Sequence, residues 1–351
     1  MNYKSLLLVS LVSLTLSSCL KKENVVCPPT EGQVGQRILI LNEGLFQQNN
    51  ASLTWANFSS GAVSQNYFQQ IAGRPLGDTG NDIKKYGNKI YIVLNISSTI
   101  EVLDATTYAV IEQIEMHNNG LAKQPRYIDF HGGKAFVTCY DGYVDVIDTL
   151  NLSVIHRIPV GSNPDHLRVA GNMVYVSNSG GLNFPDYDST VSVISALSLT
   201  EIKKINVGIN PGSIAVGGNG NVYVVTRGNF GSIPSRMSKI ETLTDTKSES
   251  YAFEVNSLSE KNGDVLIFET SGAPSVKLFD VNSNVLQSAS LIDFTGIATP
   301  YEVQYESSSD RIYVFDANGY VNTGKVLEYS GNGGFIRDFK SGLVPKRLVY
   351  L

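Results

Sequence analysis

The segment MVYVSNS, residues 173–179, is one copy of a short apolar strand that recurs along the chain. The other copies are RILILNE (37–43), KIYIVLN (89–95), KAFVTCY (134–140), NVYVVTR (221–227), DVLIFET (264–270) and RIYVFDA (311–317). Successive copies begin 39 to 52 residues apart. A period of this size is typical of propellers and other repeat proteins, and it overrides the two domains that length alone would suggest.

Each copy belongs to a larger repeat of strands. A second, alternating strand follows it and ends in a polar turn, as in YVDVIDTLNLSV (143–154), and a more polar third strand comes after that turn. A proline-led apolar strand, such as NPDHLRV (163–169), precedes the copy. Four strands per repeat, with no amphipathic helix anywhere, predict an all-β fold: a seven-bladed β-propeller over residues 36–351.

The two ends of this region are expected to meet. The strand at 37–43 lacks an innermost neighbour, while VPKRLVYL (344–351) matches the proline-led strands but has no hairpin after it. Pairing the C-terminal strand with the first blade would close the ring and remove an exposed sheet edge. Deletion of 345–351 should therefore be severely destabilising. Trp55 is expected to fill the gap between the first and second blades.

The N-terminal segment predicts export. Residues 1–18 combine one lysine with an apolar run (6–16) that is too short to span a membrane, as in a signal peptide. Leu16-Ser17-Ser18-Cys19 resembles a lipobox, which predicts a lipidated Cys19 and a tether over 19–35. An ordinary secretory signal is the alternative. A lipid anchor would hold the protein at the outer membrane without crossing it. LKKEN (20–24) loosely resembles surface-export signals of Bacteroidota lipoproteins, which predicts exposure at the cell surface.

Charge and cysteine content narrow the possibilities further. The net charge is −5, the pI is near 5.5 and no basic stripe is present, which argues against nucleic acid as a partner. Of the three cysteines, Cys19 would carry the lipid. Cys27 and Cys139 either pair with each other or leave Cys139 as a buried thiol, and the second interpretation is favoured because Cys139 lies within an apolar strand.

The long loops are predicted to open on one face of the propeller. In a four-stranded blade, the loop between the second and third strands and the loop after the outermost strand share a face, and in this chain these are 42–52, 71–82, 117–126, 177–190, 226–238 and 316–325. The opposite face would carry tight turns such as Asp104-Ala105-Thr106. Because loops on a rigid scaffold carry function, the face with the long loops is the predicted binding face.

Amides, aromatic rings and arginines dominate that predicted face. The candidate binding residues are Asn42, Phe46, Gln47, Gln48, Asn49, Asn50, Arg74, Asn95, Arg126, Tyr140, Tyr143, Asn178, Phe184, Tyr187, Arg227, Phe230, Tyr301 and Tyr320, with Asn163, Asn183, Asn229 and Arg347 nearby. Such a surface suits a large, polar, uncharged to anionic ligand, with arginine available for phosphate or carboxylate. In the alternative interpretation the asparagines serve turns and the tyrosines pack between blades.

No catalytic pattern is evident, so the sequence predicts no enzyme activity, no cofactor and no metal site. The four histidines fall in different repeats, without ligand spacing, and are expected on the surface or in loops: His117, His131, His156 and His166. A calcium site is less favoured than turn capping for the four loop aspartates Asp78, Asp82, Asp186 and Asp188. No G-x-S-x-G elbow occurs.

The first blade carries a family resemblance. ILNEG (40–44) followed by NNASLT (49–54) resembles the YncE-like propeller lipoproteins of Bacteroidota. The repeat NPDHLRVAGNMVYVSN (163–178) is similar to those of YncE-like and surface-layer propellers in general. Chain size, lipobox and first blade together resemble the BtuG-type vitamin B12-binding surface lipoproteins. The resemblance covers essentially the whole mature chain, although the repeat motif is specific for the propeller and not for the ligand.

That resemblance implies a seven-bladed propeller that captures cobalamin as a ligand and passes it to a TonB-dependent outer-membrane transporter. It carries over no set of contact residues. Within this interpretation NEGLFQQNN (42–50) is expected to face the ligand, and alanine at Gln47, Gln48, Asn49 and Asn50 should weaken binding without lowering thermal stability. The alternative is an adhesion or scaffold lipoprotein that binds glycans or proteins. A propeller hydrolase or lyase is the third possibility, but it would need a metal or a carboxylate pair.

Overall fold

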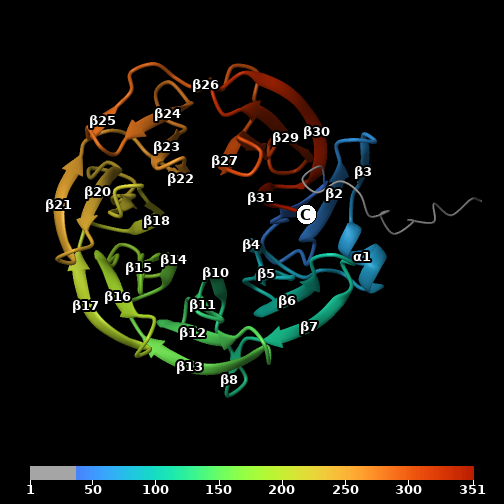
Figure 1. The fold of residues 1–351 in the computed structure, drawn as a ribbon, viewed down its shortest axis with the longest axis horizontal. Helices are drawn as coiled ribbons and strands as arrows, with labels where there is room; N and C mark the ends of the chain where they lie inside the picture. The colour runs from blue at the N-terminus through green and yellow to red at the C-terminus, as the bar shows by residue number, and fades with distance from the viewer. Residues whose placement is uncertain (1–36) are drawn as a thin grey trace, which may run out of the picture. The chain divides into compact units, whose positions relative to one another are not determined.

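The computed structural model describes residues 37–351, which form seven antiparallel sheets arranged around a central axis (Figure 1). The prediction of an all-β, seven-bladed propeller is confirmed. The predicted signal peptide, the lipidation site Cys19, Cys27 and the tether lie outside the described residues. Within residues 37–351 the structure contains no helix with the length and apolar character that a membrane span requires.

Each blade has four strands, which follow one another from the central axis outward. Blade 1 consists of β31 (Pro345–Tyr350), β1 (Arg37–Asn42), β2 (Ser52–Asn57) and β3 (Ala62–Ser64). Blade 2 consists of β4 (Gly80–Tyr86), β5 (Lys89–Leu94), β6 (Thr99–Asp104) and β7 (Val110–Glu115). Blade 3 consists of β10 (Pro125–His131), β11 (Lys134–Cys139), β12 (Tyr143–Asp148) and β13 (Ser153–Pro159). Blade 4 consists of β14 (Pro164–Ala170), β15 (Met173–Asn178), β16 (Thr190–Ser195) and β17 (Thr200–Asn206).

The last three blades follow the same order. Blade 5 consists of β18 (Pro211–Val216), β19 (Val222–Thr226), β20 (Arg236–Glu241) and β21 (Thr246–Tyr251). Blade 6 consists of β22 (Ser257–Lys261), β23 (Asp264–Glu269), β24 (Ser275–Asp280) and β25 (Val285–Leu286), with β26 (Ile292–Asp293) also paired to β24. Blade 7 consists of β27 (Pro300–Glu306), β28 (Arg311–Asp316), β29 (Thr323–Ser330) and β30 (Phe335–Leu343). A two-stranded hairpin, β8 (His117–Asn118) and β9 (Leu121–Ala122), interrupts the connection from blade 2 to blade 3.

The ring closes as the sequence predicts. β1 pairs antiparallel with β31, from Ile38 opposite Tyr350 to Asn42 opposite Pro345. Beyond the last paired residues, the Leu351 N–H donates to the Arg37 carbonyl at 3.0 Å. Residues from the two ends of the propeller therefore share one sheet.

The second strand of each blade is apolar on both sides because it lies between two neighbouring blades. β1 and β5, for example, are buried along almost their whole length, whereas the outermost strand β21 is mostly exposed. Trp55 of β2 stacks on Tyr67 with ring centroids 6.0 Å apart and packs on a core cluster drawn from blades 1 and 2. Its predicted position between these blades is confirmed.

The prediction of a chain without helices is wrong at one place. α1 (Tyr67–Ala72) is a single short helix in the connection from blade 1 to blade 2. It starts after Asn66 and ends at Gly73, both of which have positive φ, and the Gly73 N–H donates to the Gln69 carbonyl. Tyr67 and Phe68 are buried and fix the helix to the blades. A helix this short shows too few residues for a periodic pattern to be visible.

Two faces follow from the strand order. The six long loops of the sequence analysis all connect a second strand to a third, or an outermost strand to the next blade, so they lie together on what we call the loop face. The connections between first and second strands, and between third and outermost strands, form the turn face. Asp104 illustrates the turn face, since its Oδ1 accepts the N–H groups of Thr106 and Thr107 at 2.9 and 2.8 Å.

Candidate functional site

The first long loop presents part of its predicted amide set to solvent. Phe46, Gln47, Gln48 and Asn49 are exposed. The loop backbone is held by the buried Asp78, whose Oδ1 and Oδ2 accept the N–H groups of Gln47 and Asn49 at 3.1 and 2.8 Å. Three exposed amides on a fixed backbone are therefore available on this loop.

Asn50, in the same loop, has a different role. Its Oδ1 accepts the Leu45 N–H at 2.7 Å, so this side chain shapes the loop. Alanine at Asn50 should therefore cost stability of about 1 kcal/mol by loss of that bond. Alanine at Gln47, Gln48 and Asn49 is the cleaner test of ligand contact.

Three predicted asparagines lie inside the blades. Asn42 and Asn178 are fully buried and occupy equivalent positions at the ends of β1 and β15. Asn178 Nδ2 donates to Thr190 and Ser192, its Oδ1 accepts the Gly161 N–H, and Asn42 repeats this pattern with Ser52, Thr54 and Gly342. Asn95 is also buried and donates to the Pro125 carbonyl. With their amides engaged inside the fold, these residues do not present a surface to a ligand.

An exposed group of rings, Phe184, Tyr187 and Phe230, lies on the loop face of blades 4 and 5, and we call it the aromatic cluster. Phe184 and Tyr187 meet edge to face at 6.0 Å, and Tyr187 meets Phe230 edge to face at 6.2 Å. Phe184 and Phe230 are each 74% exposed. Since a phenylalanine in water gains nothing from exposure, two exposed phenylalanines that contact the same tyrosine from neighbouring loops indicate a contact surface.

A polar depression of about 550 Å³ adjoins the aromatic cluster. The loop that carries Phe184 and Tyr187 also supplies Asn183 and Asp188 to its wall, while blade 3 supplies Tyr140 and Asn163. Asp188 fixes this loop, because its Oδ2 accepts the Ser162 N–H at 3.0 Å and its Oδ1 accepts the Thr190 N–H at 2.9 Å. The predicted residues Tyr140, Phe184, Tyr187 and Phe230 are thus brought together, with Asn163 and Asn183 beside them.

The other predicted aromatic residues lie elsewhere. The Tyr301 hydroxyl donates to Glu43 at 2.5 Å. The Tyr301 ring meets Tyr320 edge to face, with centroids 5.8 Å apart, on the loop face of blade 7. The Tyr143 ring lies under the Arg157 guanidinium, 4.1 Å from its centroid. The Tyr301 group does not line the depression, whereas Arg157 pairs with Asp141 in the wall of the depression. The predicted set is therefore divided between two parts of the molecule.

The predicted arginines are already paired with carboxylates. Arg74 makes a two-pronged ion pair with the fully buried Glu101, at 2.7 and 2.9 Å. Arg126 Nε and Arg227 Nη2 both donate to Asp165, at 3.1 and 2.8 Å. These three arginines are not free to receive a phosphate or carboxylate.

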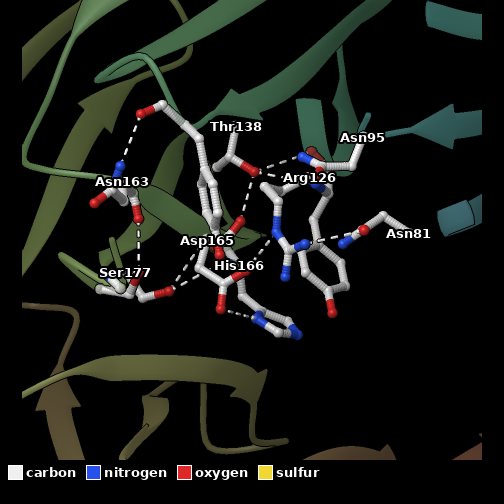
Figure 2. A network of polar contacts seen from close by, with 12 residues as sticks. Asn81, Asn95, Arg126, Thr138, Asn163, Asp165, His166 and Ser177 are labelled. Carbon is white, nitrogen blue, oxygen red and sulfur yellow. Dashed lines mark hydrogen bonds and ion pairs between the residues drawn. The ribbon is translucent and has the colours of Figure 1, made fainter. Parts of the chain in front are cut away.

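Arg126 and Asp165 belong to a network of side chains around the central channel, which we call the channel network; Figure 2 shows the part around these two residues from close by. Arg126 on β10 also donates from Nη1 to Asn81 on β4 at 3.0 Å. Lys346 on β31 pairs with Glu43 at 3.1 Å. Arg347 is 3.9 Å from Asp82 and 3.7 Å from Glu302. Four cations thus face four carboxylates, and the charges compensate within the channel.

His166 belongs to the same network, and its predicted place on the surface is wrong. It sits on β14 beside Asp165 (Figure 2), with only 5% of its surface exposed. Its ring stacks on Tyr127, with centroids 3.6 Å apart. Its Nδ1 lies 3.4 Å from Asp165, but neither ring nitrogen has a hydrogen-bond partner among residues 37–351. Burial, partly offset by Asp165, lowers the pKa of His166 to about 3. The imidazole is therefore neutral at physiological pH.

His166 predicts a pH dependence of stability. Below pH 6.5 the unfolded chain binds a proton at this residue while the folded protein does not, so the free energy of unfolding falls by about 1.4 kcal/mol per pH unit toward the folded pKa. His166→Phe keeps a ring against Tyr127 and removes the titration. We expect the loss between pH 6.5 and 4.5 to be about 2 kcal/mol smaller in this variant, measured by urea unfolding. The exposed His156, changed to Phe, is the control, and an equal pH slope in wild type and His166→Phe would contradict the assignment.

A cavity of about 700 Å³ lies on the axis and opens toward the turn face. It is lined by the later halves of the inner strands, including Lys84, Arg168 and Gln304, and Arg347 lies at its inner end. Lys84 pairs with Asp129 at 2.9 Å and Arg168 pairs with Glu260 at 3.1 Å. This axial cavity is on the face opposite the predicted binding face.

Sequence inspection missed the channel network, although a signal was present. In five inner strands the two residues after the leading proline face the channel region, and they include Arg126 and Tyr127, Asp165 and His166, and Lys346 and Arg347. In β18 the corresponding residue is Gly212. A Cβ there would lie 2.4 Å from the Arg227 guanidinium carbon, so glycine makes room for that arginine. Reading these pairs across repeats would have revealed the network.

Other chemical groups in the described chain have structural roles. No set of three His, Cys, Asp or Glu side chains within residues 37–351 is arranged to hold a metal ion. Asp78 and Asp188 bind backbone N–H groups, which is the turn-capping role favoured for them. Cys139 is a buried free thiol, as expected, and burial raises the pKa of its thiol well above the usual value.

The sequence also matches a known family. Residues 36–330 match the family described as a domain of unknown function, DUF5074. The chain belongs to this family. No curated relative matches the sequence.

Solved structures similar to this DUF5074 protein share its propeller. A quinonprotein alcohol dehydrogenase-like protein from Bacteroides thetaiotaomicron VPI-5482 superposes with a TM-score of 0.68 at 14% identity, covering 90% of this chain and 78% of that one. Hydrazine synthase from Kuenenia stuttgartiensis gives a TM-score of 0.60 at 15% identity, covering 74% and 85%. At such identities the likeness concerns the fold alone.

Proposed function

We propose that this DUF5074 protein is a lipid-anchored lipoprotein of the outer-membrane surface. In this proposal it captures a corrinoid such as cobalamin on the loop face and hands it to a TonB-dependent transporter. Anchoring would be through Cys19, and no catalytic step is involved. The proposal rests on the resemblance of the first blade to YncE-like and BtuG-type lipoproteins and on the surface that the loop face offers.

The observation that carries the proposal is the aromatic cluster beside the polar depression. Phe184 and Phe230 offer flat apolar area, and the exposed amide of Asn183 lies in the wall of the depression. A corrinoid combines a broad, largely apolar ring with a fringe of side-chain amides, so one part of the ligand would meet the rings and another the amides. A ligand of this size would lie across the face, with Gln47, Gln48 and Asn49 on the loop of blade 1.

The nucleotide phosphate of cobalamin needs a cation, and the paired arginines do not supply one. Lys204 lines the depression and is 42% exposed, with Glu201 3.6 Å away. A partner at that distance makes a weak, exposed ion pair that a phosphate can displace. Lys204 is therefore the phosphate contact in this proposal.

The first test is direct. The chain from residue 28 onward is mixed with cyanocobalamin and desalted, and the corrin absorbance of the protein fraction is read. Stoichiometric colour supports the proposal. A colourless fraction from folded protein would contradict the proposal and favour the alternative, an adhesion or scaffold protein. A glycan array and a pull-down with outer-membrane proteins would then test that alternative. The same rings that suit a corrin also stack on sugars.

A variant localises the ligand. Phe184→Ala combined with Phe230→Ala is expected to weaken corrinoid affinity by about 10- to 100-fold, because these two exposed rings are the apolar anchors of the proposed site. Thermal stability should change little, since both side chains lie in solvent. The control is Phe335→Ala, which makes the same change at a phenylalanine 59% exposed in blade 7. Isothermal titration with cyanocobalamin gives the affinities, and an unchanged value in the double variant removes the aromatic cluster from the site.

A further inference from the structure

Six blades share one five-residue turn between the third and outermost strands. The turns start at Asn57, Asp104, Asp148, Ser195, Glu241 and Asp280. In every one the fifth residue has positive φ, between 50° and 71°: Gly61, Tyr108, Leu152, Leu199, Asp245 and Asn284. Their common geometry places the third residue of each turn at the outer tip of the turn face.

The identity of that third residue divides the blades into two groups. Blades 1, 2 and 6 carry Ser59, Thr106 and Asn282 there, as expected for a solvated turn. Blades 3, 4 and 5 carry leucines, Leu150, Leu197 and Leu243, which are 81%, 71% and 97% exposed. The turn itself does not require leucine, because the same backbone accepts serine, threonine and asparagine. We call these three side chains the leucine band.

The leucine band lies on three adjacent blades. Blades 3, 4 and 5 are neighbours, as the positions of β13, β17 and β21 in Figure 1 show. Lys203 of blade 4 donates to the Thr244 carbonyl in the turn of blade 5 at 3.2 Å. Ile155 and Ile202, on the outermost strands of blades 3 and 4, are about half exposed and extend the apolar surface. Single exposed leucines are ordinary, but equivalent ones on three adjacent blades indicate a contact surface.

The start of the propeller lies on the same face. Arg37 begins β1 opposite Asn57, the first residue of the blade 1 turn. The chain that joins the propeller to Cys19 therefore leaves from the turn face. Residues 20–36 lie between, and if fully extended they would reach at most roughly 60 Å. An anchor at Cys19, which is part of the proposed function, keeps the turn face within reach of the lipid surface at all times.

We propose that the leucine band inserts into the lipid surface to which the chain is anchored. Three side chains cover much less than the ~800 Å² per partner of a stable protein interface, which argues against a protein as the occupant. A small insertion is effective for a tethered protein, because the tether makes the contact intramolecular. Resting on its leucine band, the propeller directs the loop face, with the aromatic cluster, away from the membrane.

The test uses the full lipidated chain on vesicles of phosphatidylethanolamine and phosphatidylglycerol. Cys27→Ser leaves Cys139, which is fully buried, and a new cysteine carries an environment-sensitive dye. Ser198→Cys labels the fourth position of the blade 4 turn beside Leu197, and Ser283→Cys labels the same position of the blade 6 turn beside Asn282. Both leave the leucines intact. We expect a blue shift of emission and quenching by a lipid-borne quencher at position 198, and neither at position 283.

A second variant assigns the effect to the leucines. In the Ser198→Cys protein, Leu150, Leu197 and Leu243 are each replaced by asparagine. The equivalent turn of blade 6 already has asparagine at this position. The blue shift and the quenching should disappear while the protein stays on the vesicles. Equal signals at 198 and 283, no signal at either, or a signal that survives the triple replacement would overturn the proposal. Release of the whole protein from the vesicles would instead refute the anchor, and with it this orientation of the propeller.

Discussion

Deletion of residues 345–351 is expected to abolish folding of the propeller. This segment contributes Leu348, Val349 and Leu351 to the core, all nearly fully buried, and each such side chain is worth about 1.5–3 kcal/mol. Deletion also removes Lys346 and Arg347, which leaves Glu43, Asp82 and Glu302 without their cations. These losses are comparable with the whole stability of a typical domain, about 5–15 kcal/mol. Circular dichroism and a thermal scan should show no cooperative transition near that of the full chain.

A point variant measures how much one side chain of β31 contributes to stability. Leu348→Ala removes one core side chain of β31 and should cost about 2–5 kcal/mol. The matched control, Leu121→Ala, makes the same change at a side chain 75% exposed and should stay within about 0.5 kcal/mol. Urea unfolding measures both. A cooperative transition of normal stability in the deletion variant would mean that blade 1 holds together without β31, and that the ring is not closed by this strand.

The sequence predicted those features of the fold that are repeated. Seven similar apolar strands predicted seven blades. The strand at 37–43, which lacks an innermost neighbour, and the strand at 344–351, which has no hairpin after it, predicted that β1 and β31 pair and close the ring. The helix α1 was not predicted, because it is short, occurs once and depends on the packing of Tyr67 and Phe68 against blades 1 and 2. Features held by tertiary packing leave little trace in local sequence.

The candidate site was predicted less completely, for two physical reasons. Residue type alone does not distinguish Asn42 and Asn178, which serve the blade interior, from the exposed Gln47 and Gln48, because an amide suits both settings. The arginines looked available because their partner Asp165 comes from a different blade than Arg126 and Arg227. Phe184 and Phe230 were foreseen individually, but their contact through Tyr187 depends on how two loops of neighbouring blades approach.

The channel network leads to the second large effect. Asp165 is 1% exposed and accepts hydrogen bonds from both Arg126 and Arg227. Burial alone would raise the pKa of its carboxyl, but the two guanidinium groups more than offset burial and hold the pKa well below its usual range. The resulting stability is present above the unfolded pKa near 4 and is lost as the pH falls through the folded pKa. At neutral pH the carboxylate contributes its full stabilisation.

Asp165→Asn is expected to destabilise the protein by up to about 3–5 kcal/mol at pH 7, since it leaves two partly buried guanidinium groups without their counter-charge. Urea unfolding measures the loss. Asp338→Asn is the control, because Asp338 is half exposed and its ion pair with Lys325 is long, at 4.0 Å, and therefore weak. Adding Arg227→Met to Asp165→Asn removes one of the surplus charges and should restore part of the stability. A loss below about 1 kcal/mol, or no restoration by Arg227→Met, would mean that water in the channel screens these charges. The four cations and four carboxylates would then not act as a mutually dependent set.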